Sequence, residues 1–289
     1  MAQKLSRATQ NWQPQRYLKF QHQRLRPALD LLARVSELPT AEDDAVEIVD
    51  LGAGTGNMAP SFLYEASLKR WPTARVTFVD SSTSMLEVAQ REHKANESLE
   101  TQRFAYVEAD FETYEPERPV DLIFSNAALQ WARADQHKSI LLRLYSFLKP
   151  GGVLAFQIPD TRLQPNYHLM LKAAAGLGLS DRVAGVRSVT CEHDPEFYYK
   201  LFKSADSNVE LDVWVTVYAH VLEGDNPVAE FTSSTGLRPF MKALDEPSTE
   251  ATQFEQKYRD LIAAAYPKQS GGSTIFNCKR FFLSATKPL

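Results

Sequence analysis

Cysteine is scarce in this chain of 289 residues, which holds only Cys191 and Cys278. Two cysteines cannot build the disulfide framework of a small secreted protein, and they fit a reducing compartment. No apolar run reaches the roughly 18–20 residues that a membrane-spanning helix needs. The N-terminal region also lacks the apolar stretch of a secretory signal peptide. These absences favour a cytoplasmic protein that has no membrane partner.

An excess of positive charge is also missing. The formal net charge is −4, and the sequence pI is about 5.9. Nucleic-acid-binding proteins usually present a basic stripe, so no nucleic-acid partner is expected. Apolar residues make up 44% of the chain, which is enough to bury a sizeable core in one decorated α/β domain. We expect a monomer that acts on a small molecule.

The first 29 residues contain no acid but carry several basic side chains. These are Lys4, Arg7, Arg16, Lys19, Arg24 and Arg26. A mitochondrial transit peptide has this bias, and so does a basic arm that folds over a cleft and meets anions there. Of the two we expect the arm, an arm or helix over the cleft at residues 1–36.

Short β-rich runs alternate with helical patterns through the first half of the chain. Strands are predicted at 45–51, 74–80, 103–110, 120–126 and 152–158, with helices at 57–70, 83–95 and 135–148. This alternation predicts an α/β fold, a doubly wound Rossmann-like sheet with a ligand crevice at the carboxyl ends of its strands.

The regular alternation ends after residue 159. Helices are predicted at 165–177, 194–205, 226–236 and 249–266, and strands at 209–221 and 276–287. No linker separates a second domain in this pattern. We therefore expect one domain over 1–289, with a cofactor-binding core at 45–159 and the remaining strands plus a helical cap at 160–289.

Three glycines, Gly52, Gly54 and Gly56, follow the first predicted strand. Glycine allows positive φ and lets a ligand approach the backbone closely. The helix start that follows presents free N–H groups, which suit a phosphate or a carboxylate. A dinucleotide, S-adenosylmethionine and a tight turn without a ligand all remain compatible with this motif alone.

Acidic residues at the ends of three predicted strands narrow the choice of ligand for the glycine turn. Asp50 lies just before the glycines, where it suits an ammonium group and sits poorly beside a pyrophosphate. Asp80 can accept both ribose hydroxyls of either cofactor. Asp110, with Phe111 beside it, could receive an adenine amino group. The set favours S-adenosylmethionine as the ligand over the dinucleotide of an NAD(P)-dependent oxidoreductase. For such an oxidoreductase the sequence also offers no obvious acid–base pair. A cap or a solvated turn residue is the alternative for each aspartate.

The stretch FSNAALQW at 124–131 follows the fourth predicted strand. Enzymes that methylate amino groups of bases commonly carry Asn-Pro-Pro-aromatic here, whereas this chain has Asn-Ala-Ala-Leu at 126–129. The difference argues against amine methylation of nucleic acid. Gln130 and Trp131 are expected to face the reacting end of the crevice, although core packing is an alternative for Trp131.

Residues 46–158 resemble the class I S-adenosylmethionine-dependent methyltransferases, whose sheet has seven strands. The segments at 11–35, 129–137, 155–160, 235–240 and 279–285 are similar to the trans-aconitate methyltransferases. That resemblance implies methyl transfer to a carboxylate of trans-aconitate, which gives a monomethyl ester, and an N-terminal arm that closes over the cofactor. Segments 93–102 and 182–199 depart from the family pattern. Another small acid or a hydroxyl metabolite therefore remains an alternative substrate.

The resemblance also implies a set of site residues. For S-adenosyl-L-methionine, or its product S-adenosyl-L-homocysteine, the candidates are Tyr17, Phe20, Arg26, Asp50, Gly52, Gly54, Asn57, Asp80, Ser81, Met85, Asp110, Phe111, Asn126, Ala127 and Trp131. For the acid substrate they are Tyr17, Gln130, Trp131, Tyr199, Arg238, Tyr258 and Arg280. Arg26, Arg238 and Arg280 are candidates because a guanidinium bonds a carboxylate bidentately. No catalytic base and no metal are predicted, because a carboxylate is already ionised near neutral pH.

Overall fold

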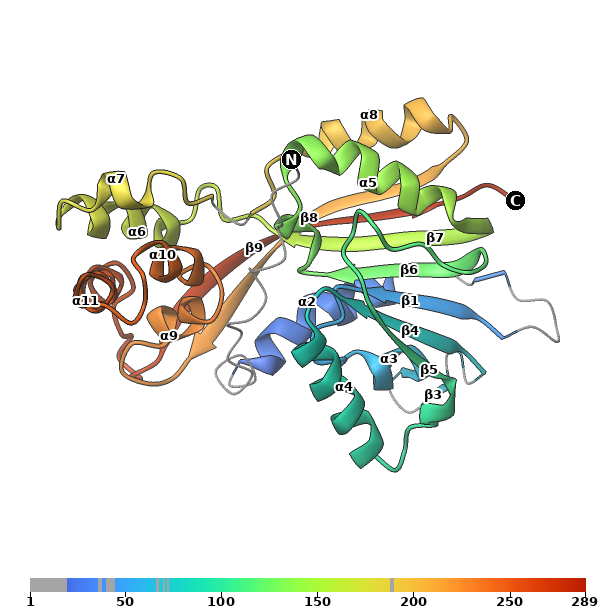
Figure 1. The fold of residues 1–289 in the computed structure, drawn as a ribbon, viewed down its shortest axis with the longest axis horizontal. Coiled ribbons are helices and arrows are strands. Elements are labelled where there is room, and N and C mark those ends of the chain that lie inside the picture. The colour runs from blue at the N-terminus through green and yellow to red at the C-terminus, as the bar shows by residue number, and fades with distance from the viewer. Residues whose placement is uncertain are drawn as a thin grey trace.

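The computed structural model of the protein describes residues 20–35, 38–39, 45–65, 68–69, 71, 73–187 and 190–289. Within these residues seven strands form one sheet in the order β5-β4-β1-β6-β7-β9-β8 (Figure 1). Their bounds are β1 Glu47–Leu51, β4 Arg75–Asp80, β5 Phe104–Glu108, β6 Val120–Asn126, β7 Leu148–Pro159, β8 Glu210–Leu222 and β9 Thr274–Thr286. Strand β9 is antiparallel to its neighbours β7 and β8, and the other pairs are parallel. This arrangement confirms the predicted fold class.

The centre of the sheet explains where a ligand can bind. Strand β1 lies between β4 and β6, and Asp50 is in register with Phe78 on one side and Phe124 on the other. Successive side chains of a strand point to opposite faces, so Ile48 and Val49 enter different halves of the core. Since β1, β4 and β6 are parallel, their carboxyl ends meet at one edge, and the loops that follow them share that edge.

Helices cover both faces of the sheet. They comprise α2 Gln21–Ala33, α3 Ala59–Leu63 and α4 Thr83–Ala95 on one face, and α5 Ala134–Ser146 and α8 Pro195–Ala205 on the other. Apolar side chains on one side of each helix make the contact; for example, Leu31 and Phe62 pack on the first face and Leu144 and Phe202 on the second. Two short 3₁₀ turns, η1 Thr101–Arg103 and η2 Leu129–Trp131, lie in the connecting loops.

The last two strands are longer than their neighbour β7. Residues 216–222 of β8 pair with 274–280 of β9, while the pairing of β7 with β9 stops at Pro159 and Arg280. This two-stranded extension carries a separate group of helices beside the sheet (Figure 1). The helices of this lobe are α6 Pro165–Ala175, α7 Ser180–Val183, α9 Pro227–Ser233, α10 Arg238–Ala243 and α11 Thr249–Ala265. The lobe shares one continuous apolar core with the sheet.

Two local predictions were wrong. The helix expected at 57–70 ends at Leu63, and β2 Tyr64–Glu65 pairs with β3 Leu68–Lys69 in a short antiparallel hairpin. Apolar periodicity over so short a segment does not separate a helix from a hairpin. The strand expected at 152–158 begins earlier, because β7 starts at Leu148, and inside it the Gly151 N–H donates to Lys287 O.

Candidate active site

The three glycines of the turn after β1 differ in the space around them. Gly52, Gly54 and Gly56 all have positive φ, at 77°, 56° and 68°. A Cβ atom on Gly52 would lie 2.2 Å from the Ala128 Cβ, and one on Gly56 would lie 2.5 Å from the His93 Cε1. Among the described residues no atom comes within 4 Å of the position that a Cβ would take on Gly54. Gly54 is therefore where the turn leaves room for a ligand, as a cofactor-binding turn requires.

Asp80 holds this turn in place from the end of β4. One carboxylate oxygen accepts a hydrogen bond from the Gly54 N–H at 2.9 Å, and the other accepts one from the Ser82 N–H at 2.9 Å. Burial raises the pKa of Asp80, while these backbone donors act to lower it. The side chain remains partly exposed at the sheet edge, where a ribose could reach it.

Asp50 is the most perturbed acid of the site. It is 2% exposed at the end of β1, and burial together with the negative charge of Asp80 raises the pKa of its carboxyl group to about 8. The acid is thus protonated at neutral pH in the ligand-free protein. A ligand cation beside it would favour the carboxylate. A buried acid perturbed in this way, two residues before a glycine turn, is a functional candidate.

The loop after β6 connects the glycine turn to a pocket. Ala127 has φ of 51°, a conformation that costs energy for a residue with a Cβ atom. Its carbonyl accepts from the Gln130 Nε2 at 2.5 Å, and the Gln157 Nε2 donates to the Asn126 Oδ1 at 2.5 Å. Because Ala128 also abuts Gly52, this loop touches both parts of the site.

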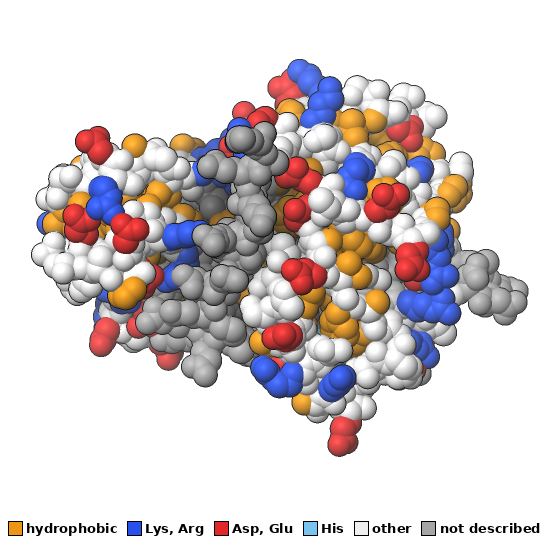
Figure 2. Space-filling model, viewed as in Figure 1, with side chains coloured by type: hydrophobic (Ala, Val, Ile, Leu, Met, Phe, Trp, Pro, Cys, Tyr) orange, Lys and Arg blue, Asp and Glu red, His pale blue; other side chains and the backbone are white. Residues whose placement is uncertain are grey.

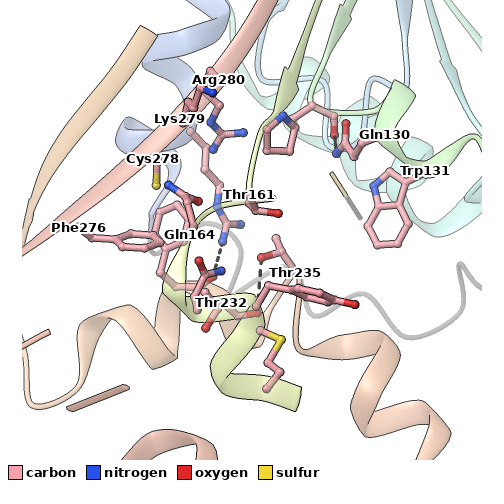
Figure 3. A pocket seen from close by; sticks show the side chains of 18 of the residues that line it. Gln130, Trp131, Thr161, Gln164, Thr232, Thr235, Phe276, Cys278, Lys279 and Arg280 are labelled. Atoms are coloured by element: carbon pink, nitrogen blue, oxygen red, sulfur yellow. Dashed lines mark hydrogen bonds between the residues drawn. The ribbon is translucent and has the colours of Figure 1, made fainter. Parts of the chain in front are cut away.

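A pocket of about 130 Å³ lies between the sheet edge and the helical lobe (Figure 3). Its lining comes from elements far apart in the chain, among them α2, η2, α6, α9 and β9. Representative side chains are Arg24, Gln130, Asn166, Thr232 and Arg280. A concave site where a lobe meets the sheet edge is a usual place for a small-molecule ligand.

The pocket is electropositive. Arg24 and Arg280 are only 7% and 8% exposed, and Lys279 adds a third cation. The Nε of Arg280 is buried with no hydrogen-bond partner among the described residues. The Nη2 of Arg24 donates to the Phe231 carbonyl at 3.1 Å and to the Ser234 hydroxyl at 2.8 Å, while the Lys279 Nζ lies 2.9 Å from an Asp160 oxygen. The lining residues that the structure describes include no Asp, Glu or His.

The structure brings many of the predicted residues together. The pocket lining includes five of them, namely Asn126, Ala127, Gln130, Trp131 and Arg280.

Other predicted residues lie near the glycine turn or beside the pocket. Asn57 is partly buried and lies next to the glycine turn, while exposed Ser81 and buried Met85 follow β4. Buried Phe20 has its ring centroid 5.1 Å from that of the pocket residue Phe231. Tyr17 lies outside the described residues.

Asp110 and Phe111 follow β5 as expected. The Asp110 Oδ1 accepts from the N–H groups of Glu112 and Thr113, at 2.8 and 3.0 Å, which makes the residue a turn cap. Phe111 is partly buried against the core. The hydrogen bonds described involve only this oxygen of the carboxylate. The contact to an adenine ring stays a prediction.

Two predicted tyrosines lie away from the pocket. Tyr258 is fully buried in the lobe, and its hydroxyl lies 2.7 Å from the Thr232 Oγ1, so it packs behind the pocket and is not among the lining residues described. Tyr199 is 52% exposed on α8, a helix that covers the sheet and contributes no described lining residue. The sequence does not show which side of its helix each aromatic ring takes, and a contact of either ring with the acid stays a prediction.

Two predicted arginines also lie elsewhere. Arg26 is exposed on α2, and its guanidinium carbon lies 5.4 Å from the centroid of the Tyr218 ring. Arg238 donates to Glu246 at 2.7 Å and is not among the lining residues described. The helical period of α2 would have identified Arg24, since Ala28 and Leu31 lie on the same buried side. For Asn166 and Lys279 the sequence shows no comparable pattern that would have placed them in the pocket.

Comparison with known proteins identifies the family. Residues 48–152 match the model of a methyltransferase domain. The trans-aconitate 2-methyltransferase of Streptomyces avermitilis is 38% identical over 281 residues, covering 97% of this chain and 98% of that protein. The enzyme of the same name from an Azoarcus species is 38% identical over 276 residues, covering 96% and 99%. This chain belongs to the trans-aconitate 2-methyltransferase family.

Solved structures support the fold. The YcgJ protein of Bacillus subtilis aligns with a TM-score of 0.53 at 15% identity, covering 91% of this chain and 99% of that one. A mycolic acid cyclopropane synthase, solved with S-adenosylhomocysteine, aligns with a TM-score of 0.51 at 13% identity, covering 94% and 88%. The family membership confirms the predicted class, an S-adenosylmethionine-dependent methyltransferase, and removes the oxidoreductase alternative. Among the described residues no helix is long and apolar enough to span a membrane.

Proposed function

We propose that this protein transfers a methyl group from S-adenosylmethionine to one carboxylate of trans-aconitate or a closely related polycarboxylic acid, which gives a monomethyl ester. The observation that carries the proposal is the pocket with two buried arginines and, among its described lining residues, no acidic side chain. A buried guanidinium needs an anion or a full set of acceptors, and a carboxylate satisfies its planar fork. The trans-aconitate 2-methyltransferases to which the chain is similar act on the same class of acid.

The glycine turn and the strand ends fit the cofactor. Asp50 would hold the ammonium group, Gly54 would lie under the amino-acid end, Asp80 would accept the ribose hydroxyls, and Asp110 with Phe111 would contact the adenine. When bound, the cofactor supplies an electrophilic methyl group on a sulfonium. The open space at Gly54 and the buried, protonated Asp50 support this assignment.

The residues of the pocket would act by binding and alignment. A carboxyl group has a pKa of about 4 in water, so the substrate oxygen needs no proton removed before it attacks. Arg24 and Arg280 would bind carboxylates that do not react, and Gln130 and Trp131 would bound the reacting end. Rate acceleration would then come from orientation and from exclusion of water.

The two buried arginines of the pocket favour an acid with more than one carboxylate. Arg24 comes from α2 and Arg280 from β9, so two carboxylates of one acid can each meet a guanidinium. Asn166, in the first turn of α6, is 6% exposed and lines the pocket, and its Oδ1 has no partner among the described residues. Because this oxygen is an acceptor, it suits a donor such as a hydroxyl or a protonated carboxyl group. A monocarboxylate would satisfy only one of the two arginines.

The test is an assay of the purified protein with S-adenosylmethionine and a panel of mono-, di- and tricarboxylates, with the esters identified by mass spectrometry. We expect a monomethyl ester of trans-aconitate and little product from monocarboxylates. Calorimetry should show that S-adenosylhomocysteine binds first and strengthens the binding of trans-aconitate. Binding of S-adenosylhomocysteine without an ester from any acid would remove the proposed substrate while leaving the methyltransferase class intact.

We also expect a cytoplasmic monomer that needs no nucleic acid. Acidic and basic side chains are interspersed over the face of the molecule in Figure 2, with no continuous basic stripe across its described surface. Light scattering of the purified protein would test the monomeric state, and a salt-dependent binding assay would test the absence of nucleic-acid binding.

A further inference from the structure

Segment 182–199 departs from the family resemblance, yet one of its side chains reaches the loop that lines the pocket. The Arg187 Nη2 donates to the carbonyls of Gln130 and Trp131 at 2.7 and 2.9 Å, and its Nη1 donates to the Ala132 carbonyl at 2.8 Å. The Glu192 carboxylate accepts from the same Nη1 at 2.8 Å. One guanidinium thus binds three consecutive carbonyls at the carboxyl end of η2.

This contact has a clear electrostatic basis. The last carbonyls of a helical turn have no intrahelical donor and form its negative end. A guanidinium carries several donors in one rigid plane, so it can satisfy three carbonyls only when they point in a fixed direction. A lysine has no such fork and would not impose the same orientation. Arg187 therefore specifies how η2 is turned relative to the sheet.

The turn that Arg187 binds belongs to both halves of the site. Gln130 and Trp131 line the pocket, and Ala128 lies directly against Gly52 of the glycine turn. The Leu129 carbonyl has a further contact at 3.1 Å with the Nε2 of His137 from α5. A rotation of η2 would move the pocket wall relative to the cofactor turn.

We propose that Arg187 is a positioning residue for methyl transfer. It fixes η2 so that Gln130 and Trp131 hold the bound acid in line with the cofactor methyl group. The part of this inference that concerns the acid rests on the proposed function; the part that concerns η2 does not. A misplacement of the reacting groups by about 1 Å can reduce the rate about 100-fold, so a residue that acts only through backbone carbonyls can still control turnover.

The test compares Arg187→Gln and Arg187→Lys with Arg182→Gln. Arg182 lies in the same segment and binds Asp245 and Glu250 at 2.8 and 2.6 Å, away from η2. We expect kcat of Arg187→Gln to fall about 10- to 100-fold, with the Kd for S-adenosylhomocysteine changed less than about threefold. Arg187→Lys should recover part of kcat, and Arg182→Gln should stay within about twofold of the wild type.

Two further readouts separate positioning from general stabilisation. Added methylguanidine should restore kcat in Arg187→Ala and have no effect on Arg182→Gln. Hydrogen exchange across residues 126–132 should become faster in the Arg187 variants only. A kcat of Arg187→Gln within twofold of the wild type, or an equal loss in Arg182→Gln, would overturn the proposal.

The outcome does not depend on the acid being identified correctly. If the wild-type protein methylates no carboxylate, the proposed function fails, and hydrogen exchange with S-adenosylhomocysteine bound still tests Arg187. Unchanged exchange at residues 126–132 in Arg187→Gln would then overturn the positioning role. If Arg187→Gln does not fold, Arg187→Lys carries the same comparison, because it keeps the charge and loses the planar fork.

Discussion

The cofactor half and the acid half of the site are built in different ways. The cofactor half consists of short loops after β1, β4 and β6, and the backbone supplies much of it, as the Asp80 contact with the Gly54 N–H shows. The acid half consists of side chains from several elements that lie far apart in the chain. Arg24 of α2, for example, is held by a hydrogen bond to Ser234 beyond α9.

The positions of the residues in the two halves are therefore set in two different ways. In the cofactor half the parallel register of the sheet places every loop at one edge, so the positions follow from the fold itself. In the acid half each side chain depends on the packing of the lobe against the β8–β9 extension. We therefore expect changes in the first half to abolish cofactor binding, and changes in the second to alter substrate affinity alone.

The largest effect should come from Asp50→Asn. Removing one partner of a buried charge pair costs about 3–5 kcal/mol, so the affinity for S-adenosylhomocysteine should fall by more than about 100-fold. Calorimetry measures this loss, and Asp110→Asn at the exposed turn is the matched control, with a smaller expected effect. An unchanged affinity of Asp50→Asn for S-adenosylhomocysteine would contradict the assignment of Asp50 to the ammonium group.

The same substitution should stabilise the ligand-free protein. The pKa of Asp50 is about 8 in the folded state, above its ordinary value near 4, so unfolding releases a proton between these pH values. The contribution of Asp50 to the free energy of unfolding therefore falls as pH rises from about 4 to 8. Thermal melts at pH 8 should show a higher Tm for Asp50→Asn than for the wild type.

A pH dependence of cofactor binding follows from the same group. If the ammonium binds the ionised form of Asp50, affinity for S-adenosylhomocysteine should rise about tenfold per pH unit below pH 8 and level off above it. Calorimetry in two buffers of different ionisation enthalpy should detect the released proton. A pH-independent affinity in the wild type, or the same slope in Asp50→Asn, would contradict the link.

Arg280→Met tests whether the two halves are separable. A hydrogen bond to a charged group contributes about 1.5–3 kcal/mol, so KM for trans-aconitate should rise about 10- to 100-fold. The Kd for S-adenosylhomocysteine should not change. Arg26→Met, at an exposed position of α2, should stay within about threefold of the wild type in both quantities. Equal weakening of cofactor and acid binding in Arg280→Met would mean that the halves act as one site.

The cofactor half is easier to predict from the sequence for a physical reason. The positions of Asp50, Gly54 and Asp80 depend on local patterns, namely a buried strand followed by a turn, and the parallel sheet then brings such turns together. The acid half depends on which side of each helix is buried. Arg24 and Arg26 are two residues apart on α2, and only the helical period, applied to its buried residues, distinguishes the one that reaches the pocket.

Tyr258→Phe should have the smallest effect. The Tyr258 hydroxyl is bonded to Thr232 in a fully buried place, and burial raises its pKa, so it stays neutral at physiological pH. Losing one buried neutral hydrogen bond should lower the free energy of unfolding by about 1 kcal/mol, with KM and kcat unchanged. Denaturant unfolding and a standard rate assay measure both. Thr232 lines the pocket and Tyr258 lies behind it. A tenfold rise in KM would therefore show that Tyr258 controls acid binding through the position of Thr232. The acid half would then include residues that support the pocket lining as well as the lining itself.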